Sequence, residues 1–251
     1  MGLSRWVTAL NLAPAALLKF GTAARRHRKF SQRGWPRNSW LALGTLALMA
    51  SARPALSEST GIDQLQRIGS GNPVAGKRKS EEERCQECHG PDGISVDEKI
   101  PNHAGQYAGY LIKQLNNFQS GARKHETMSI MAADLTSADM ADIAAYFASQ
   151  KIMQGLREHK DAQAENLFVN GDPARDIPSC ASCHGENGKG RFADNLYYPV
   201  IGGQRVIYLR SQLFFWKLGD RKNSPDAVMN KIAGALGEAE IEELARYVSE
   251  L

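Results

Sequence analysis

Cysteine is scarce in this sequence of 251 residues, and its four copies all lie in two short motifs, so none is left outside them. The sequence also lacks a G-x-G-x-x-G dinucleotide-binding motif and any nucleophile–base pair recognisable by motif. No strand pattern of useful length occurs, which favours a helical fold. These absences argue against an enzyme with its own substrate site.

Acidic residues are absent from residues 1–57, although this segment holds nine of the 31 lysines and arginines. The remaining chain therefore carries 22 basic and 27 acidic residues, a net charge of −5. The formal net charge of +4 for the whole sequence thus comes from the leading segment. No basic surface for nucleic acid is indicated in the rest of the chain.

Long hydrophobic runs are also absent, since the apolar run Trp40–Ala50 has only eleven residues and is too short to span a bilayer. Cations precede this run and small residues follow it, as in an export signal. We therefore interpret residues 1–57 as an export leader, with cleavage after Ala52 or Ser57. An uncleaved amphipathic anchor is the alternative.

The four cysteines belong to two C-x-x-C-H motifs, at residues 85–89 and 180–184. This motif is the attachment signature of a c-type haem: the thiols form thioethers to the haem, and the histidine becomes the proximal iron ligand. The candidate attachment residues are Cys85, Cys88, Cys180 and Cys183, and the candidate proximal ligands are His89 and His184.

Other uses of the cysteines fit less well. A thioredoxin-like redox pair would occur once and would leave the following histidine unexplained. A zinc ribbon would place its two C-x-x-C pairs about 15 to 20 residues apart, whereas the first cysteines here are 95 residues apart. Two structural disulfides would not require the histidines either.

The chain after the leader is a tandem repeat. Gly105-Gln106 matches Gly203-Gln204 at an offset of 98 residues, as Arg123-Lys124 matches Arg221-Lys222. Two similar units explain these matches as a duplicated domain. We predict an N-terminal domain over residues 58–152 and a C-terminal domain over residues 153–251.

Each unit is predicted to be helical. We expect one helix to begin at Pro73 after Asn72, one to begin at Thr136 with a variant capping box, and one over residues 159–170 that ends near Gly171. The expected core faces of the last helix in each unit are Met140, Ile143, Ala144 and Phe147, and Ile241, Leu244, Ala245 and Val248.

A six-coordinate haem needs a second axial ligand, which is typically methionine in electron-transfer cytochromes c. Met229 is the only methionine after the linker, and the repeat pairs it with Met128, since each lies seven residues before a matched leucine. Met131 and His125 are the fallbacks in the first unit. Pro101 and Pro199 follow the two motifs, and their carbonyls are candidates to orient the proximal histidines. The alternative is that both prolines only form turns.

From roughly residue 72 to its end, the chain resembles the diheme cytochrome c4 family, a tandem of two class I cytochrome c domains. The resemblance rests on CQECHGPDG and CASCHGENG, AGQYAGYLIKQL and GGQRVIYLRSQL, and MSIMAADLTSADMADIAAYFASQ. It implies an all-α fold of two tandem class I cytochrome c domains, each wrapped around one covalently attached haem c. It also implies two axial pairs, His89 with Met128 and His184 with Met229. The chain departs from the family at His103, where an apolar residue is usual.

The function implied by the resemblance is electron transfer without catalysis, in the periplasm, by a soluble or membrane-associated protein. Family members carry electrons from the quinol-oxidising respiratory chain to a terminal oxidase, often of the cbb3 type. The expected partners are thus redox proteins. The alternative is a diheme subunit of a periplasmic dehydrogenase, such as a sulfide dehydrogenase.

Overall fold

The computed structural model describes residues 61–158 and 161–251. The described residues all belong to one compact unit. We call residues 61–152 the first half of this unit and residues 153–251 the second half. The division into two domains at this point stays a prediction.

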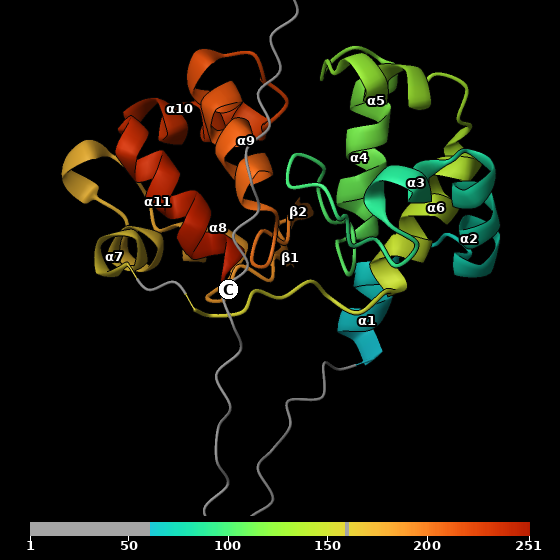
Figure 1. Ribbon diagram of the computed structural model, residues 1–251, viewed down its shortest axis with the longest axis horizontal. Coiled ribbons are helices and arrows are strands. Elements are labelled where there is room, and N and C mark those ends of the chain that lie inside the picture. Colours follow the sequence, from blue (N-terminus) through green and yellow to red (C-terminus); the bar gives the residue numbers. More distant parts are fainter. Residues whose placement is uncertain (1–60, 159–160) are drawn as a thin grey trace, which may run out of the picture. The chain divides into compact units, whose positions relative to one another are not determined.

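The first half consists of helices (blue to yellow in Figure 1). The last helix packs against two earlier ones, α2 and α4. In order, the elements are α1 (Gly61–Ile68), α2 (Pro73–Glu82), α3 (Cys85–His89), α4 (Ala108–Gln119), α5 (Glu126–Met131) and α6 (Ser137–Ser149).

Local sequence signals set where these helices begin. Asn72 caps α2, because its side chain accepts hydrogen bonds from the backbone amides of the first turn and Pro73 occupies the first helical position. Thr136 and Asp139 form a reciprocal capping box at the start of α6. Both predicted helix starts are confirmed.

The second half repeats this order with additions. Its α11 packs against α9 and α7, as α6 does against its neighbours in the first half. The elements are α7 (Ala162–Asn170), the short 3₁₀ helix η1 (Pro173–Arg175), α8 (Cys180–His184), strands β1 (Arg191–Ala193) and β2 (Leu196–Tyr198), α9 (Val206–Leu218), η2 (Pro225–Ala227), α10 (Val228–Ala235) and α11 (Glu238–Ser249).

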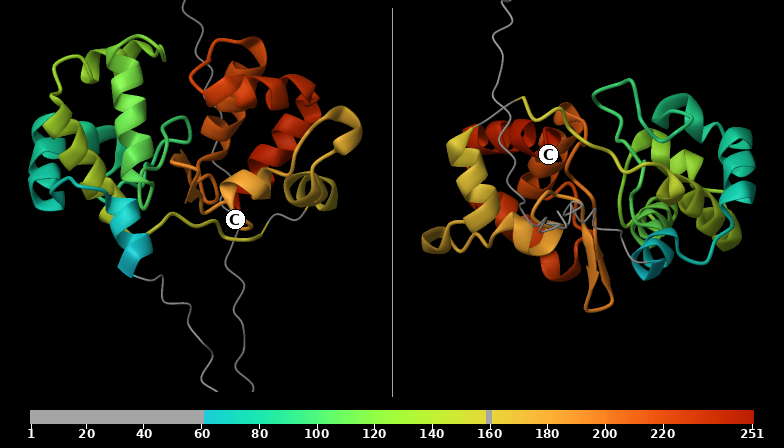
Figure 2. Two further views of the ribbon diagram at one scale, coloured as in Figure 1. Left: turned by 180° about the vertical axis from the view of Figure 1, so that it is seen from behind. Right: turned by 90° about the horizontal axis from the view of Figure 1, so that it is seen from below.

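Two features of the second half differ from the sequence-based expectation. The helix expected over residues 159–170 begins at Ala162, because the Asp161 side chain caps it there, and it ends before Gly171 as expected. The second difference is an antiparallel hairpin of β1 and β2, visible as orange arrows in the right-hand view of Figure 2. Its two turn residues, Asp194 and Asn195, both have positive φ, as a tight hairpin turn requires. Strands of three residues are too short to give a periodic signal.

Each half has its own hydrophobic core. The expected core faces of the last helices are confirmed, since Met140, Ile143, Ala144 and Phe147 are buried in the first core. Ile241, Leu244, Ala245 and Val248 are buried in the second. These cores hold α6 and α11 against the segments that carry the haem motifs.

Across residues 61–158 and 161–251, no helix is both long and apolar enough to cross a lipid bilayer. The apolar run Trp40–Ala50 and the predicted export leader lie outside the described residues. The leader therefore stays a prediction.

Candidate functional site

The two C-x-x-C-H motifs form the same local structure. Each is a helix of five residues, α3 or α8, followed by a glycine with φ of 81°. Gly90 donates its amide to the carbonyl of Gln86, and Gly185 does the same to Ala181. A side chain at Gly90 would collide with the backbone, since its Cβ would lie 2.1 Å from the carbonyl oxygen of Ile94. The turn after the first motif thus requires glycine.

Both motif histidines are oriented by a proline carbonyl. Nδ1 of His89 lies 2.9 Å from the carbonyl oxygen of Pro101, and Nδ1 of His184 lies 2.9 Å from that of Pro199. Because a carbonyl can only accept, the proton is on Nδ1, and Nε2 keeps its lone pair for a metal. Burial lowers the pKa of both histidines, which favours this neutral form.

The first thiol of each motif is held in an apolar setting. Burial raises the pKa of Cys85 and of Cys180 to about 11. A dithiol redox centre needs the opposite, a thiol whose pKa is lowered towards neutrality. None of the four cysteines is paired in a disulfide. This environment fits covalent attachment to a hydrophobic group better than a reactive thiol pair.

The two predicted axial methionines lie at matched places, near the N-termini of short helices. Met128 lies in α5, where its amide donates to Nδ1 of His125 at 3.3 Å. Met229 lies in α10, and its amide donates to the hydroxyl of Ser224 at 3.3 Å. Both side chains are partly buried. Their role as iron ligands stays a prediction.

Two arginines link the halves through hydrogen bonds to uncharged side chains. Arg123 donates to Gln114 in its own half and to Tyr208 and Gln212 in the other. Arg221 is 7% exposed, and its bonds mirror these, to Gln212 in its own half and to Tyr110 and Gln114 in the other. Arg123 lies over the ring of Phe118, and Arg221 lies over that of Trp216.

Within the part of the chain that the structure describes, no Asp or Glu forms an ion pair with either guanidinium. Burying a cation without an anion costs free energy. The arrangement fits a bound group that brings its own carboxylates, as haem does. Together with the oriented imidazoles and the four cysteines that form no disulfide, it shows that the residues present suit two c-type haems.

A second connection between the halves is reciprocal. Gln106 donates to the carbonyl of Val200 and accepts from its amide, at 2.8 and 2.9 Å. Gln204 makes the same pair of bonds to Asn102, at 2.9 and 2.7 Å. Asn102 and Val200 each follow a proline whose carbonyl orients a histidine. The two motif loops are therefore fixed by the opposite half.

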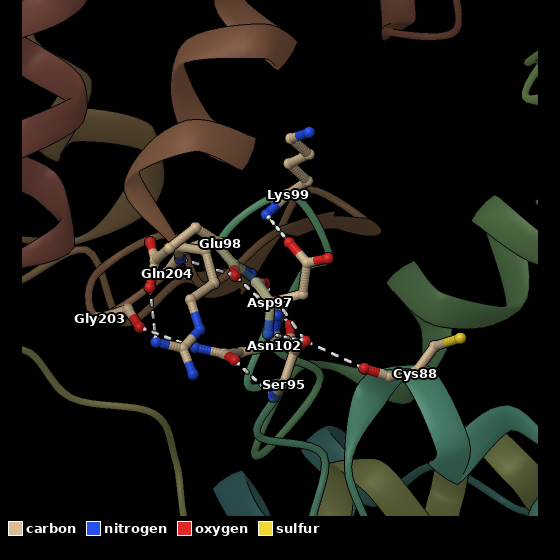
Figure 3. A network of polar contacts seen from close by, with 9 residues as sticks. Cys88, Ser95, Asp97, Glu98, Lys99, Asn102, Gly203 and Gln204 are labelled. Carbon is tan, nitrogen blue, oxygen red and sulfur yellow. Dashed lines mark hydrogen bonds and ion pairs between the residues drawn. The ribbon is translucent and has the colours of Figure 1, made fainter. Parts of the chain in front are cut away.

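Figure 3 shows how the first motif joins this connection. The hydroxyl of Ser95 donates to the carbonyl of Cys88 at 2.9 Å, and the amide of Ser95 donates to the Asn102 side chain at 2.9 Å. Asn102 in turn donates to Gln204, and through its side chain to the carbonyl of Gly203. An unbroken series of hydrogen bonds thus runs from helix α3 to the second half.

Comparison with known proteins agrees with these features. The family model for cytochrome c matches residues 73–151. Cytochrome c4 of Pseudomonas aeruginosa is 37% identical over 183 residues, which cover 72% of this chain and 89% of that protein. The chain belongs to the cytochrome c4 family.

Two further relatives extend this result. The crystal structure of reduced cytochrome c4 from Pseudomonas stutzeri matches with a TM-score of 0.66 and 35% identity, over 72% of this chain and 100% of that one. A thiosulfate dehydrogenase electron acceptor of Stutzerimonas stutzeri is 32% identical over 213 residues, or 83% of this chain and 93% of that protein. As a cytochrome c4, the chain is an electron carrier and not an enzyme, and it binds two haem c groups covalently. The predicted all-α cytochrome c fold is confirmed.

Sequence reasoning missed the residues that join the halves. The repeats Gly-Gln and Arg-Lys, at an offset of 98 residues, were the available signal. They show that glutamine and arginine recur at matched positions, but not that each reaches across to the other half. Only the three-dimensional structure supplies those partners.

Proposed function

We propose that this cytochrome c4 is a periplasmic two-haem electron shuttle in which a histidine and a methionine ligate each iron. The observation that carries the proposal is the matched pair of histidine–proline hydrogen bonds at 2.9 Å, one in each half. The proposed axial pairs are His89 with Met128 and His184 with Met229. When bound, each haem supplies a one-electron iron couple.

The protein's own groups prepare both sites for that couple. Pro101 and Pro199 hold the proton of each proximal imidazole on Nδ1, so the ring does not have to change tautomer or orientation. A methionine thioether carries no proton at any ordinary pH, and it favours the reduced iron. With both axial positions filled by side chains, neither iron would offer a site for substrate.

The acceptor we favour is a terminal oxidase of the cbb3 type, with a quinol-oxidising complex as the donor. This choice rests on the resemblance of the sequence to the cytochrome c4 family. The net charge of −5 over residues 58–251 supports docking to a positively charged partner surface. Such docking would be weakened by salt, because the Debye length shrinks as ionic strength rises.

A dehydrogenase is the second candidate partner, as donor. The supporting observation is the relative named as a thiosulfate dehydrogenase electron acceptor, which matches over 93% of its own length. Under this proposal the chain accepts electrons released by oxidation of a sulfur compound and passes them to the respiratory chain. The same two haem sites would serve either donor.

Stopped-flow spectroscopy of the purified holoprotein separates these partners. The oxidised protein is mixed with thiosulfate plus a purified thiosulfate dehydrogenase, or with a quinol-oxidising complex and its quinol. The reduced protein is mixed with a cbb3 oxidase and oxygen. We expect rapid oxidation of both haems by the oxidase, at a rate that falls steeply with added salt. Failure of the oxidase to oxidise either haem would contradict the first proposal. Reduction of the haems by the dehydrogenase but not by the quinol-oxidising complex would favour the dehydrogenase as donor.

Periplasmic localisation is part of the same proposal. It is supported by the basic, acid-free segment of residues 1–57 with its short apolar run. Fractionation of cells that express the full chain, followed by mass spectrometry of the mature N-terminus, tests it. We expect haem-containing protein in the periplasm, whereas intact protein that remains in the cytoplasm would contradict it.

A further inference from the structure

The loops that follow the two haem motifs make the same backbone hydrogen bonds, but they carry different side chains, among them His103 in the first half and Ile201 in the second. His103 and Ala104 donate their amides to the carbonyl of Gly93, at 2.7 and 3.0 Å. Ile201 and Gly202 donate theirs to the carbonyl of Gly188, at 2.8 and 2.9 Å. The repeat offset of 98 residues pairs His103 with Ile201. An imidazole in the first half thus occupies the position of an aliphatic side chain in the second.

The next packing layer differs in the same way. Gly105 donates to the carbonyl of Phe147, and Gly203 donates to that of Val248, so these residues of α6 and α11 are also equivalent. The ring of Phe147 meets His103 edge-on, with centroids 5.5 Å apart. In the second half, Ile201 packs against the core that contains Val248. One loop therefore has an aromatic pair where the other has an aliphatic pair.

His103 lies directly against the proximal histidine. Its ring stacks on that of His89, with centroids 4.0 Å apart and planes at 28°. The imidazole of His103 therefore brings a dipole and two ring nitrogens to within stacking distance of the proposed iron ligand.

We infer that His103 is a positioning residue that tunes the first haem through its contact with His89. The polar ring on the proximal ligand stabilises the additional positive charge of ferric iron, compared with the hydrocarbon side chain of Ile201. Apolar surroundings disfavour charge, and the polarity of the groups around a metal ligand sets its potential. The imidazole of His103 therefore lowers the reduction potential of the first haem, compared with an aliphatic side chain at the same position.

This inference rests on the proposed ligation of iron by His89, and the experiment separates the two. The histidine is replaced by the residue of the other half in H103I, and the reverse exchange is made in I201H. The control is I201L, which changes shape without changing polarity. Each holoprotein is titrated with a redox mediator set while proton NMR follows the haem methyl signals of each haem separately.

In H103I we expect the potential of the first haem to rise, while that of the second stays unchanged. At a fixed solution potential, the ratio of ferric to ferrous iron at the first haem should change roughly threefold to tenfold. A tenfold change corresponds to a shift of about 59 mV for one electron. In I201H the potential of the second haem should fall, and in I201L both potentials should match the wild type. A role of His103 in packing alone would change stability but would not produce opposite shifts at the two haems.

Three results would overturn the inference: no shift in H103I, a downward shift, or equal shifts at both haems. If H103I yields no holoprotein, I201H decides the question, and an unchanged second potential in that variant overturns the inference. The absorption spectrum of the same samples reports ligation. A wild-type spectrum with an unshifted potential refutes only the role of His103. Unchanged iron coordination in an H89A variant would instead refute the proposed ligation.

Discussion

The side chains of Arg123 and Arg221 show how strongly single residues join the halves. Each guanidinium lies on an aromatic ring of its own half and donates to a tyrosine and a glutamine of the other half. A buried hydrogen bond to a charged group is worth more than one between neutral groups. Loss of one arginine would also leave buried acceptors unpaired.

The variant R221M is therefore expected to lower the free energy of unfolding of the holoprotein by about 2 to 4 kcal/mol. Urea unfolding followed by far-UV circular dichroism measures it. The control is R246A, because the side chain of Arg246 is 57% exposed, and its change should stay within about 0.5 kcal/mol. Equal effects of the two substitutions would contradict the role given to Arg221.

The residues of the haem motifs could be predicted from the sequence because their spacing encodes the chemistry directly. Two thiols and a histidine within five residues form one turn of helix, whatever the rest of the chain does. The contacts of Arg221 could not be predicted, because they depend on how two distant segments meet. A repeat reveals equivalent positions but gives no information on contacts between the copies.

At the scale of elements, α2 and α6 approach so closely that only glycine fits between them. A Cβ atom at Gly76 of α2 would lie 1.8 Å from the carbonyl oxygen of Asp142, and one at Gly71, just before α2, would lie 2.1 Å from that of Ala141. Backbone atoms cannot move aside as a flexible side chain can. The position of α6, and with it the core of the first half, depends on these glycines.

We expect G76A to destabilise the protein by about 1 to 3 kcal/mol, as overpacking of a close contact does. The matched control is G234A in α10, where a Cβ would meet nothing within 4 Å. Because alanine is the better helix former, G234A should stabilise the protein by up to about 1 kcal/mol. Thermal unfolding measures both changes, and a stabilising G76A would contradict the packing described for α2 and α6.

An ion-pair cluster joins η1 to the start of α11. Arg175 pairs with Glu240 at 2.7 Å and with Asp172 at 2.6 Å. Its hydrogen bonds lower the pKa of both carboxyl groups. A carboxyl whose pKa is lower in the folded state than in the unfolded state stabilises the fold above its unfolded pKa. That contribution is lost as pH falls through the folded pKa.

This cluster should steepen acid unfolding. Between roughly pH 5 and pH 3 the wild type is expected to lose more free energy of unfolding than R175A, since the variant lacks the cation that lowers both pKa values. At neutral pH the difference in free energy of unfolding should be small, because the charges lie at the surface and solvent screens them. Urea unfolding across this pH range tests the prediction, and identical pH dependence in the two proteins would rule it out.

At the scale of the whole molecule, the sequence predicted the fold class and the cofactors because a family resemblance and two motifs point to the same architecture. The hairpin of β1 and β2 was not foreseen, although it contacts the first half through Tyr197 and Tyr107, whose ring centroids are 5.7 Å apart. The reciprocal bonds of Gln106 and Gln204 join residues about 100 positions apart. Such contacts leave no periodic pattern in the sequence.

Each half is thus a haem site in its own right, and each supports the motif loop of the other through one glutamine. Both irons are proposed to have the same pair of axial ligands, histidine and methionine. Met128 of α5 and Met229 of α10 are the side chains proposed to complete the coordination of the two irons. The roles of Met128 and Met229 can be tested separately by single substitutions.

The most direct test is the long-wavelength absorption band of methionine-ligated ferric haem, measured in the wild type, M128A, M229A and the double variant. We predict that each single substitution removes half of the band and that the double substitution removes all of it. The control M140L, at a buried core position that is 1% exposed, should keep the full band. A full band in either M128A or M229A would contradict the proposed ligation.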